Sequence, residues 1–138
     1  MKARGDVPLP RRATKGSAGY DFFMPSGCTL SYNQAVTINT GISMEPGDIP
    51  QGYVGLIVPR SSWGMKYGIT LCNTVGVIDS DYTDEIVAKI RCTDPSVQTV
   101  RLNKGERFCQ MVLVPYGIIA SEIEPTATRE GGVGSTGQ

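Results

Sequence analysis

The chain has 138 residues, enough for one domain with a single hydrophobic core and too few for two. Lys plus Arg equals Asp plus Glu at 13 each, so we expect no broad phosphate-neutralising surface and no direct binding of nucleic acid. Histidine is absent, which excludes the catalytic triads and zinc sites that depend on it.

We expect neither a secretory signal nor a membrane span in the first third of the chain. Residues 1–12 are charged and lack the apolar stretch of a secretory signal. Residues 22–44 have no charge, but Ser, Thr, Asn, Gln and Gly fill the segment, so it is not a membrane span. We expect a soluble protein without a membrane partner, cytoplasmic, or nuclear in a eukaryotic or viral source. The cysteines favour small buried residues in a reducing compartment over a zinc site or disulfides: Cys28, Cys72, Cys92 and Cys109.

Short runs with a period of two follow along the chain, and this period is typical of β-strands. Turn sequences separate the runs at residues 24–27, 45–48, 94–96 and 103–106. Seventeen glycines and nine prolines argue against long helices, and Ser61–Tyr67 is the one short helix expected. The pattern predicts an all-β sandwich or barrel. The alternating residues are Val36 and Ile38; Val54, Leu56 and Val58; Ile86, Ala88 and Ile90; and Cys109, Met111 and Leu113.

Arg60, Ser61 and Ser62 follow a predicted strand and open the predicted helix. Free backbone N–H groups at a helix start, together with a guanidinium and two hydroxyls, suit a phosphate group. Ordinary N-capping by a serine is at least as common and remains an alternative.

Asp79, Asp81 and Tyr82 lie within residues 76–82. An aspartate in this segment could polarise water or hold a hydrated metal ion. Taken alone, the segment is better explained as a hairpin turn stabilised by its own aspartates.

Residues 104–110 form a charged turn that enters a strand, which a surface salt bridge would explain, although Gln110 is unusual within a strand. The glycine-rich residues 129–137 resemble a phosphate-cradling loop but lack the lysine of a P-loop. Alone, this C-terminal segment is expected to be a mobile tail, because it buries too little apolar surface to offset its ordering entropy.

Together these segments resemble the five motifs of the trimeric dUTP pyrophosphatases (dUTPases), in that family's order and at about its spacing. The motifs span residues 18–137, and the second and third are highly specific. They read Ala-Gly-Tyr-Asp at 18–21, Pro-Arg-Ser-Ser-Trp-Gly-Met-Lys at 59–66, Asn-Thr-Val-Gly-Val-Ile-Asp-Ser-Asp-Tyr at 73–82, Gly-Glu-Arg-Phe-Cys-Gln at 105–110, and the tail 129–137.

The resemblance implies a jelly-roll-like β domain over residues 1–128 and a C-terminal arm, 129–138, that closes over an active site. It also implies a homotrimer whose sites are built from three chains, with dUTP hydrolysed to dUMP and pyrophosphate in the presence of Mg²⁺. Asp79 would orient and deprotonate the attacking water; an aspartate with an ordinary pKa of about 3.9 is already ionised at neutral pH. Asp21 would act on the magnesium through water or hold the site's geometry.

The remaining roles follow from the same resemblance. Tyr82 would lie under the deoxyribose and exclude a 2′-hydroxyl, and Asn73, with backbone groups of the hairpin that includes Val77, would read the uracil edge. The phosphates would be contacted by Arg60, Ser61, Ser62, Arg107 and Gln110. Closure of the arm would use Arg129, Val133, Ser135 and Thr136.

The chain departs from the family pattern at two places. Val133 replaces a phenylalanine that stacks on uracil, which predicts a weaker lid because base–aromatic stacking contributes about 1–3 kcal/mol. Asp84 stands where glycine is usual, at some cost if the turn there needs a positive φ. The tail is also one residue shorter than the family pattern between Arg129 and its glycines, with Glu130 at a common glycine position.

Three other functions are compatible with the motifs to different degrees. A dCTP deaminase of the same superfamily would release ammonia, but its hairpin sequence differs. A nucleotide-gated interaction protein would bind a partner only with dUTP present. A purely structural jelly roll would not explain the second and third motifs together.

Overall fold

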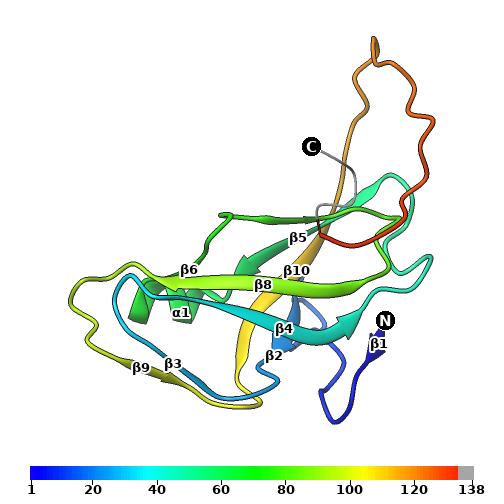
Figure 1. Cartoon of the computed structure of the whole chain (residues 1–138). Coiled ribbons are helices and arrows are strands. Elements are labelled where there is room, and N and C mark those ends of the chain that lie inside the picture. Colours follow the sequence, from blue (N-terminus) through cyan, green and yellow to red (C-terminus); the bar gives the residue numbers. More distant parts are fainter. Residues whose placement is uncertain (134–138) are drawn as a thin grey trace.

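The computed structural model describes residues 1–133 and shows a mostly β domain with one short helix (Figure 1). The all-β, jelly-roll-like class predicted from the sequence is confirmed. In chain order the elements are β1 (Lys2–Ala3), β2 (Tyr20–Phe23), β3 (Cys28–Leu30), β4 (Ala35–Ser43), β5 (Tyr53–Pro59), α1 (Ser61–Tyr67), β6 (Ile69–Leu71), β7 (Gly76–Ile78), β8 (Glu85–Cys92), β9 (Val100–Leu102) and β10 (Arg107–Pro115).

The strands form two four-stranded sheets and one two-stranded ribbon. The first sheet has the order β1-β4-β8-β6, the second has the order β2-β10-β5-β7, and β3 pairs with β9. One hydrophobic cluster contains buried residues from all three, including Ile86 of the first sheet, Phe22 of the second and Leu102 of the ribbon. The core therefore lies among the three sheets, and it is what holds them together.

The alternation predicted for β8 is confirmed, since Ile86, Ala88 and Ile90 are buried and the residues between them are exposed. In β10 the period breaks at its start, where Phe108 and Cys109 are both buried. The cause is a shift in the pairing with β2 at this point, an irregularity of the β-bulge kind that redirects successive side chains.

β5 and β10 are apolar on both faces. Their inward residues, such as Ile57 and Met111, are buried in the core. The outward residues are only half-buried, although an open sheet face normally carries polar side chains. We call them the outer apolar face, which consists of Val54, Leu56, Val58, Val112 and Val114.

Helix α1 has the bounds predicted from the sequence. It follows Pro59, and it ends at Gly68, whose left-handed φ of 59° favours glycine. Trp63 faces the core, with its ring centroid 6.1 Å from that of Phe108. The N-cap is Arg60, and no side chain caps the helix, so the expected alternative of serine N-capping does not apply.

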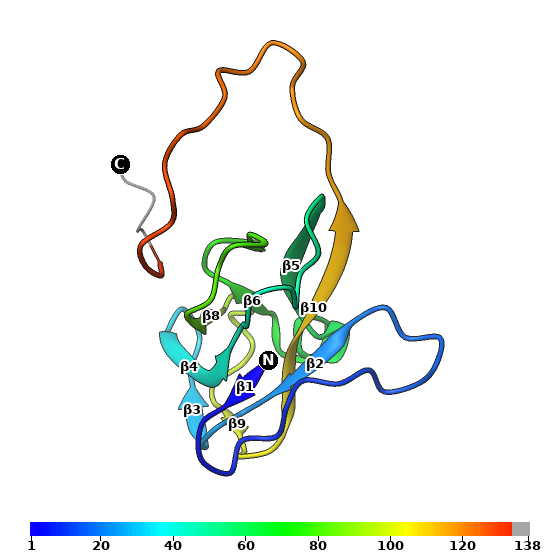
Figure 2. The same cartoon turned by 90° about the vertical axis from the view of Figure 1, so that its right-hand side faces the viewer.

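The chain beyond β10 forms an extended arm. Residues 116–128 are exposed, and Figures 1 and 2 show them arching away from the sheets before the chain returns. Ile118, Ile119 and Ile123 are 62%, 76% and 95% exposed. Ser135 and Thr136, predicted for arm closure, lie outside the described residues.

Within residues 1–133, no helix has the length and apolar character needed to cross a membrane. The cysteines are all unpaired, two of them (Cys92 and Cys109) are buried, and Cys72 is exposed.

Candidate active site

Asp79, Asp81 and Tyr82 lie on the connection between the two large sheets. β7, which precedes them, pairs with β5, whereas β8, which follows, pairs with β4 and β6. The segment is therefore not the hairpin expected from the sequence. It is a loop, residues 79–84, with one end fixed in each sheet.

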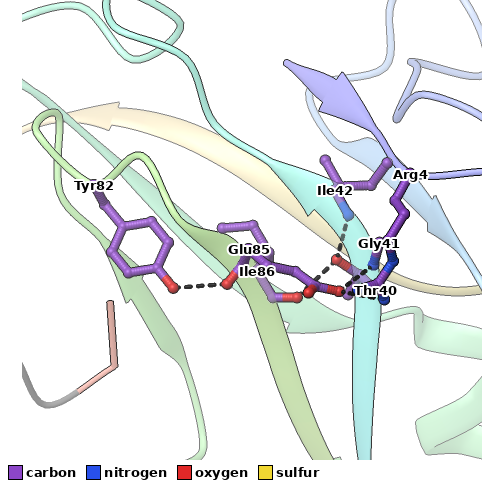
Figure 3. A network of polar contacts seen from close by, with 7 residues as sticks. All are labelled: Arg4, Thr40, Gly41, Ile42, Tyr82, Glu85 and Ile86. Carbon is purple, nitrogen blue, oxygen red and sulfur yellow. Dashed lines mark hydrogen bonds and ion pairs between the residues drawn. The ribbon is translucent and has the colours of Figure 1, made fainter. Parts of the chain in front are cut away.

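Tyr82 is held firmly where this loop joins β8. Its side chain is only 7% exposed, and its hydroxyl donates a hydrogen bond of 2.7 Å to the Glu85 carbonyl oxygen (Figure 3). Burial raises the pKa of the Tyr82 hydroxyl, and the nearby Asp84 carboxylate raises it further. The hydroxyl is therefore protonated at neutral pH and its ring has a fixed orientation.

The start of β8 is itself tied to β4 by side chains (Figure 3). The Glu85 carboxylate accepts hydrogen bonds from the Gly41 N–H at 2.7 Å and from Arg4 at 3.2 Å. The buried Thr40 hydroxyl donates to the Ile86 carbonyl oxygen at 2.7 Å. These contacts bridge the place where the β4–β8 pairing shifts, so they fix the base of the loop where the ladder is irregular.

The loop forms one wall of a cavity of about 270 Å³. The Asp79 side chain is 54% exposed there, which leaves its carboxylate accessible to water and ligand. Six residues predicted for the site line this cavity together: Asn73, Val77, Asp79, Tyr82, Arg129 and Val133.

Arg129 returns from the arm directly onto this loop. Its Nε donates to an Asp81 oxygen at 2.8 Å, and its Nη2 donates to an Asp79 oxygen. Its guanidinium also lies 5.7 Å from the centre of the Tyr82 ring. The hydrogen bond to Asp81 is the main cause of the raised pKa of Arg129. Asp81, for which the sequence offered no role, thus has a definite partner.

A second group of predicted residues surrounds the buried Asp21. The Asp21 carboxylate accepts a hydrogen bond from Arg107 at 3.1 Å and lies 3.5 Å from Arg60 Nε. Two guanidinium groups are thereby aligned on one buried carboxylate, with Arg60 30% and Arg107 41% exposed. Asp21 therefore orients both guanidinium groups.

Uncharged donors adjoin this group, since Ser61 and Ser62 follow Arg60 and Gln110 pairs with Asp21 across β10 and β2. The Ser61 and Ser62 hydroxyls make no hydrogen bond within residues 1–133. Gln110 lies against Gly19, where an added Cβ would come within 2.1 Å of the Gln110 side-chain oxygen, so a larger residue at this position would displace the Gln110 amide. With Arg60 and Arg107, these groups supply the donors that phosphate oxygens need.

The two groups lie far apart in one chain. Ile78 pairs with Gly55 near the start of β5, so Asp79 lies at the Val54 end of this strand, whereas Arg60 directly follows its other end, six residues after Val54. At the rise of a β-strand this separation is about 20 Å. The residues that line the Asp79 cavity include none of the second group. A single chain therefore does not bring its own Asp79 to its own phosphate donors.

The backbone at two positions, Asp84 in this loop and Thr74 between β6 and β7, differs from the family-based and residue-based expectations. Asp84 is not among the positive-φ residues, so the expected cost at this position does not arise. Thr74, beside Asn73, has φ of 69°, an unfavourable conformation for a β-branched residue. The sequence does not predict this conformation, since glycine and asparagine, and not threonine, are the residues that commonly adopt a positive φ.

The model of the dUTPase family matches residues 5–137. The deoxyuridine 5′-triphosphate nucleotidohydrolase of Hydrogenobaculum sp. is 39% identical over 99% of this chain and 94% of its own length. Among solved structures, the Streptococcus mutans dUTPase has a TM-score of 0.69 and 32% identity, covering 86% of this chain and 94% of its own.

Two bacteriophage structures are also similar. The Staphylococcus phage 80alpha dUTPase with dUPNHPP has a TM-score of 0.73 and 26% identity over 99% of this chain and 96% of its own. A mutant dUTPase of phage phi11 of S. aureus, described with a structural Mg(II) ion, has a TM-score of 0.71 over 91% and 93% of the two chains. Its 23% identity supports the shared fold alone.

Proposed function

The chain belongs to the dUTPase family, and we propose that it hydrolyses dUTP to dUMP and pyrophosphate with Asp79 as the base that activates water. The family membership makes it a deoxyuridine triphosphate nucleotidohydrolase. The observation that supports the finer mechanism is the cavity in which an accessible Asp79 carboxylate lies beside the rigid Tyr82 ring. An ionised carboxylate in hydrogen-bond reach of a water molecule is a competent general base.

The nucleoside half of the substrate fits the Asp79 cavity. The Tyr82 hydroxyl is engaged by Glu85 and the residue is buried, so the ring face is held in place; it would support the sugar and exclude a 2′-hydroxyl. Asn73 and Val77 line the same cavity, where the Asn73 amide and the backbone beside Val77 would read the uracil edge. The triphosphate would reach Arg60, Ser61, Ser62, Arg107 and Gln110 of another chain.

Two features of the single chain support a homotrimer. The separation of about 20 Å between the Asp79 loop and Arg60 favours sites whose two halves come from different copies. The outer apolar face and the exposed isoleucines of the arm are apolar surfaces suited to burial against a neighbour. Contacts between different surfaces close into a ring, and three copies would give three equivalent sites.

Magnesium would enter with the triphosphate. Residues 1–133 contain no group of three or more His, Cys, Asp or Glu side chains placed to hold a metal ion, and both Asp21 oxygens face arginines. Mg²⁺ commonly binds substrate phosphates and keeps several waters, so it needs few protein ligands. Bound in this way it would neutralise phosphate charge, while Asp79 and the donor groups act on water and substrate.

The arm, residues 129–138, would close over the bound nucleotide with Arg129, Val133, Ser135 and Thr136. Val133 is 82% exposed at the rim of the Asp79 cavity, where it covers little apolar surface.

Val133→Phe is expected to lower the KM for dUTP. A phenyl ring at this rim can stack on uracil, and a gain of about 1 kcal/mol would lower KM about fivefold. Steady-state pyrophosphate release measures the change, and Val133→Leu adds apolar area without an aromatic ring. An unchanged KM in Val133→Phe would mean that residue 133 does not cover the base.

The proposed activity is tested by comparing dUTP, dTTP, dCTP and UTP as substrates of the wild-type chain with Mg²⁺. We expect pyrophosphate from dUTP at the highest kcat/KM, because the cavity excludes a 2′-hydroxyl and the uracil edge selects the base. Ammonia released from dCTP would instead support a deaminase, and the absence of pyrophosphate from dUTP would overturn the proposal.

A further inference from the structure

The loop at the site presents two carboxylates to one guanidinium. Arg129 Nε binds Asp81 and its Nη2 binds Asp79, so one side chain joins both aspartates. The Arg129 side chain is 12% exposed, whereas Asp79 and Asp81 remain 54% and 62% exposed. The arginine is thus largely buried between the arm and the loop, whereas both carboxylates remain exposed, and of the two only Asp79 lines the cavity.

We propose that Asp81 is a positioning residue that holds the Arg129 guanidinium beside Asp79 and thereby docks the C-terminal arm on the catalytic loop. The inference rests on the proposed function, because it gives the arm's arginine a fixed place next to the proposed base. It assigns a role to the second aspartate of the loop, which contacts no water or substrate in the mechanism above.

A second contact shows how closely the arm lies on the loop. A Cβ added to Gly132 would come 2.8 Å from an Asp84 carboxylate oxygen and 3.3 Å from the Asp84 Cβ. Gly132 therefore allows the arm backbone to touch the far end of the loop. Arg129 thus contacts loop residues that precede Tyr82 in the chain, Gly132 lies against Asp84 which follows it, and the guanidinium also lies over the Tyr82 ring.

The two nitrogens of Arg129 have different roles in this arrangement. An incoming phosphate oxygen can replace Asp79 at Nη2, which leaves the Asp79 carboxylate available to water. The hydrogen bond from Arg129 Nε to Asp81 need not break in this exchange. The guanidinium therefore stays beside the loop while its Nη2 binds the anion. Guanidinium groups form such forked contacts with two acceptors because their N–H groups diverge in a plane.

Limited proteolysis with trypsin tests the pairing without depending on catalysis. Trypsin binds the arginine side chain in its own acidic pocket, so cleavage after Arg129 requires release from Asp81 and Asp79. The readout is the release of fragment 130–138 from the nucleotide-free, full-length protein, followed by mass spectrometry. Asp81→Asn is expected to speed this release about two- to fivefold, the range for an exposed ion pair.

Matched variants separate the pairing from general effects. Asp81→Glu keeps the charge and should restore slow release, whereas Glu124→Gln removes one negative charge from the exposed arm and should leave release unchanged. In dUTP hydrolysis, Asp81→Asn should raise KM by a similar factor with kcat within about twofold, because the pair positions the arm and not the water.

The two proposals fail in different ways. Release of fragment 130–138 at the wild-type rate from Asp81→Asn would overturn the role of Asp81, even if dUTP is hydrolysed normally. Wild-type protein that does not hydrolyse dUTP would overturn the proposed function, whatever the rate of proteolysis. Asp81 is 62% exposed, so its replacement should leave the melting temperature unchanged and the comparison interpretable.

Discussion

Asp79→Asn is expected to lower kcat for dUTP by about 10²–10⁴-fold, the contribution of a general base. The amide cannot accept the proton of the attacking water, while its size and position are nearly those of the carboxylate. Asp79 is 54% exposed and buries no apolar surface, so the melting temperature should stay close to that of the wild type. Pyrophosphate release under saturating dUTP measures the loss.

Asp81→Asn is the matched control for this experiment. It lies two residues away, is similarly exposed, and removes the same charge from the same arginine. A loss of kcat in Asp79→Asn but not in Asp81→Asn would identify Asp79 as the base. Equal losses of kcat in the two variants would mean that the total negative charge of the loop matters, and not one particular carboxylate. Near wild-type turnover by Asp79→Asn would contradict the mechanism.

Mixing two inactive variants is expected to restore activity. Asp79→Asn disables the nucleoside half of the site, and Gln110→Ala weakens the phosphate half, and we infer that each site takes these halves from different chains. In randomly mixed trimers from equal amounts, about a quarter of the sites would combine an intact Asp79 with an intact Gln110. Co-refolding the two variants and measuring pyrophosphate release gives this fraction.

The control is a pair of variants within one half of the site. Asp79 and Tyr82 line the same cavity of one chain, so mixing Asp79→Asn with Tyr82→Ala should restore nothing. If the Asp79→Asn and Gln110→Ala mixture is also no more active than its components, each site lies within one chain. That result would require the arrangement of about 20 Å along β5 to change on substrate binding.

The sequence predicts those parts of the fold whose information is local. Ile86, Ala88 and Ile90 alternate over enough residues to show a period of two, and Pro59 and Gly68 bound the helix on either side. Strands such as β3 and β9 have three residues each, which is too short for any period to appear. Their formation depends on pairing with each other across the chain, which no local pattern encodes.

The candidate site divides in the same way. Asp79 and Tyr82 are adjacent in sequence, and their motif identifies them together. Asp81 meets Arg129 across 48 residues, because the arm leaves the sheets and returns, and composition alone does not encode that path. The expected hairpin was wrong for a related reason: β7 pairs with β5 instead of β8, and the sequence does not show which strand is the partner.

The loop of residues 79–84 has one end in each sheet, and this has a consequence for the enzyme's response to heat. The Tyr82 N–H donates to the Asp79 carbonyl oxygen at 3.1 Å, so base and ring are held together locally. The cavity beside them is lined by Val77 of β7 and Val87 of β8, so its shape depends on how the two sheets fit together, and the buried core sets that fit. Slight loosening of the core would distort this cavity before the chain unfolds. We therefore expect thermal inactivation to precede melting, so that the upper working temperature is set by the registry of two layers and not by global stability.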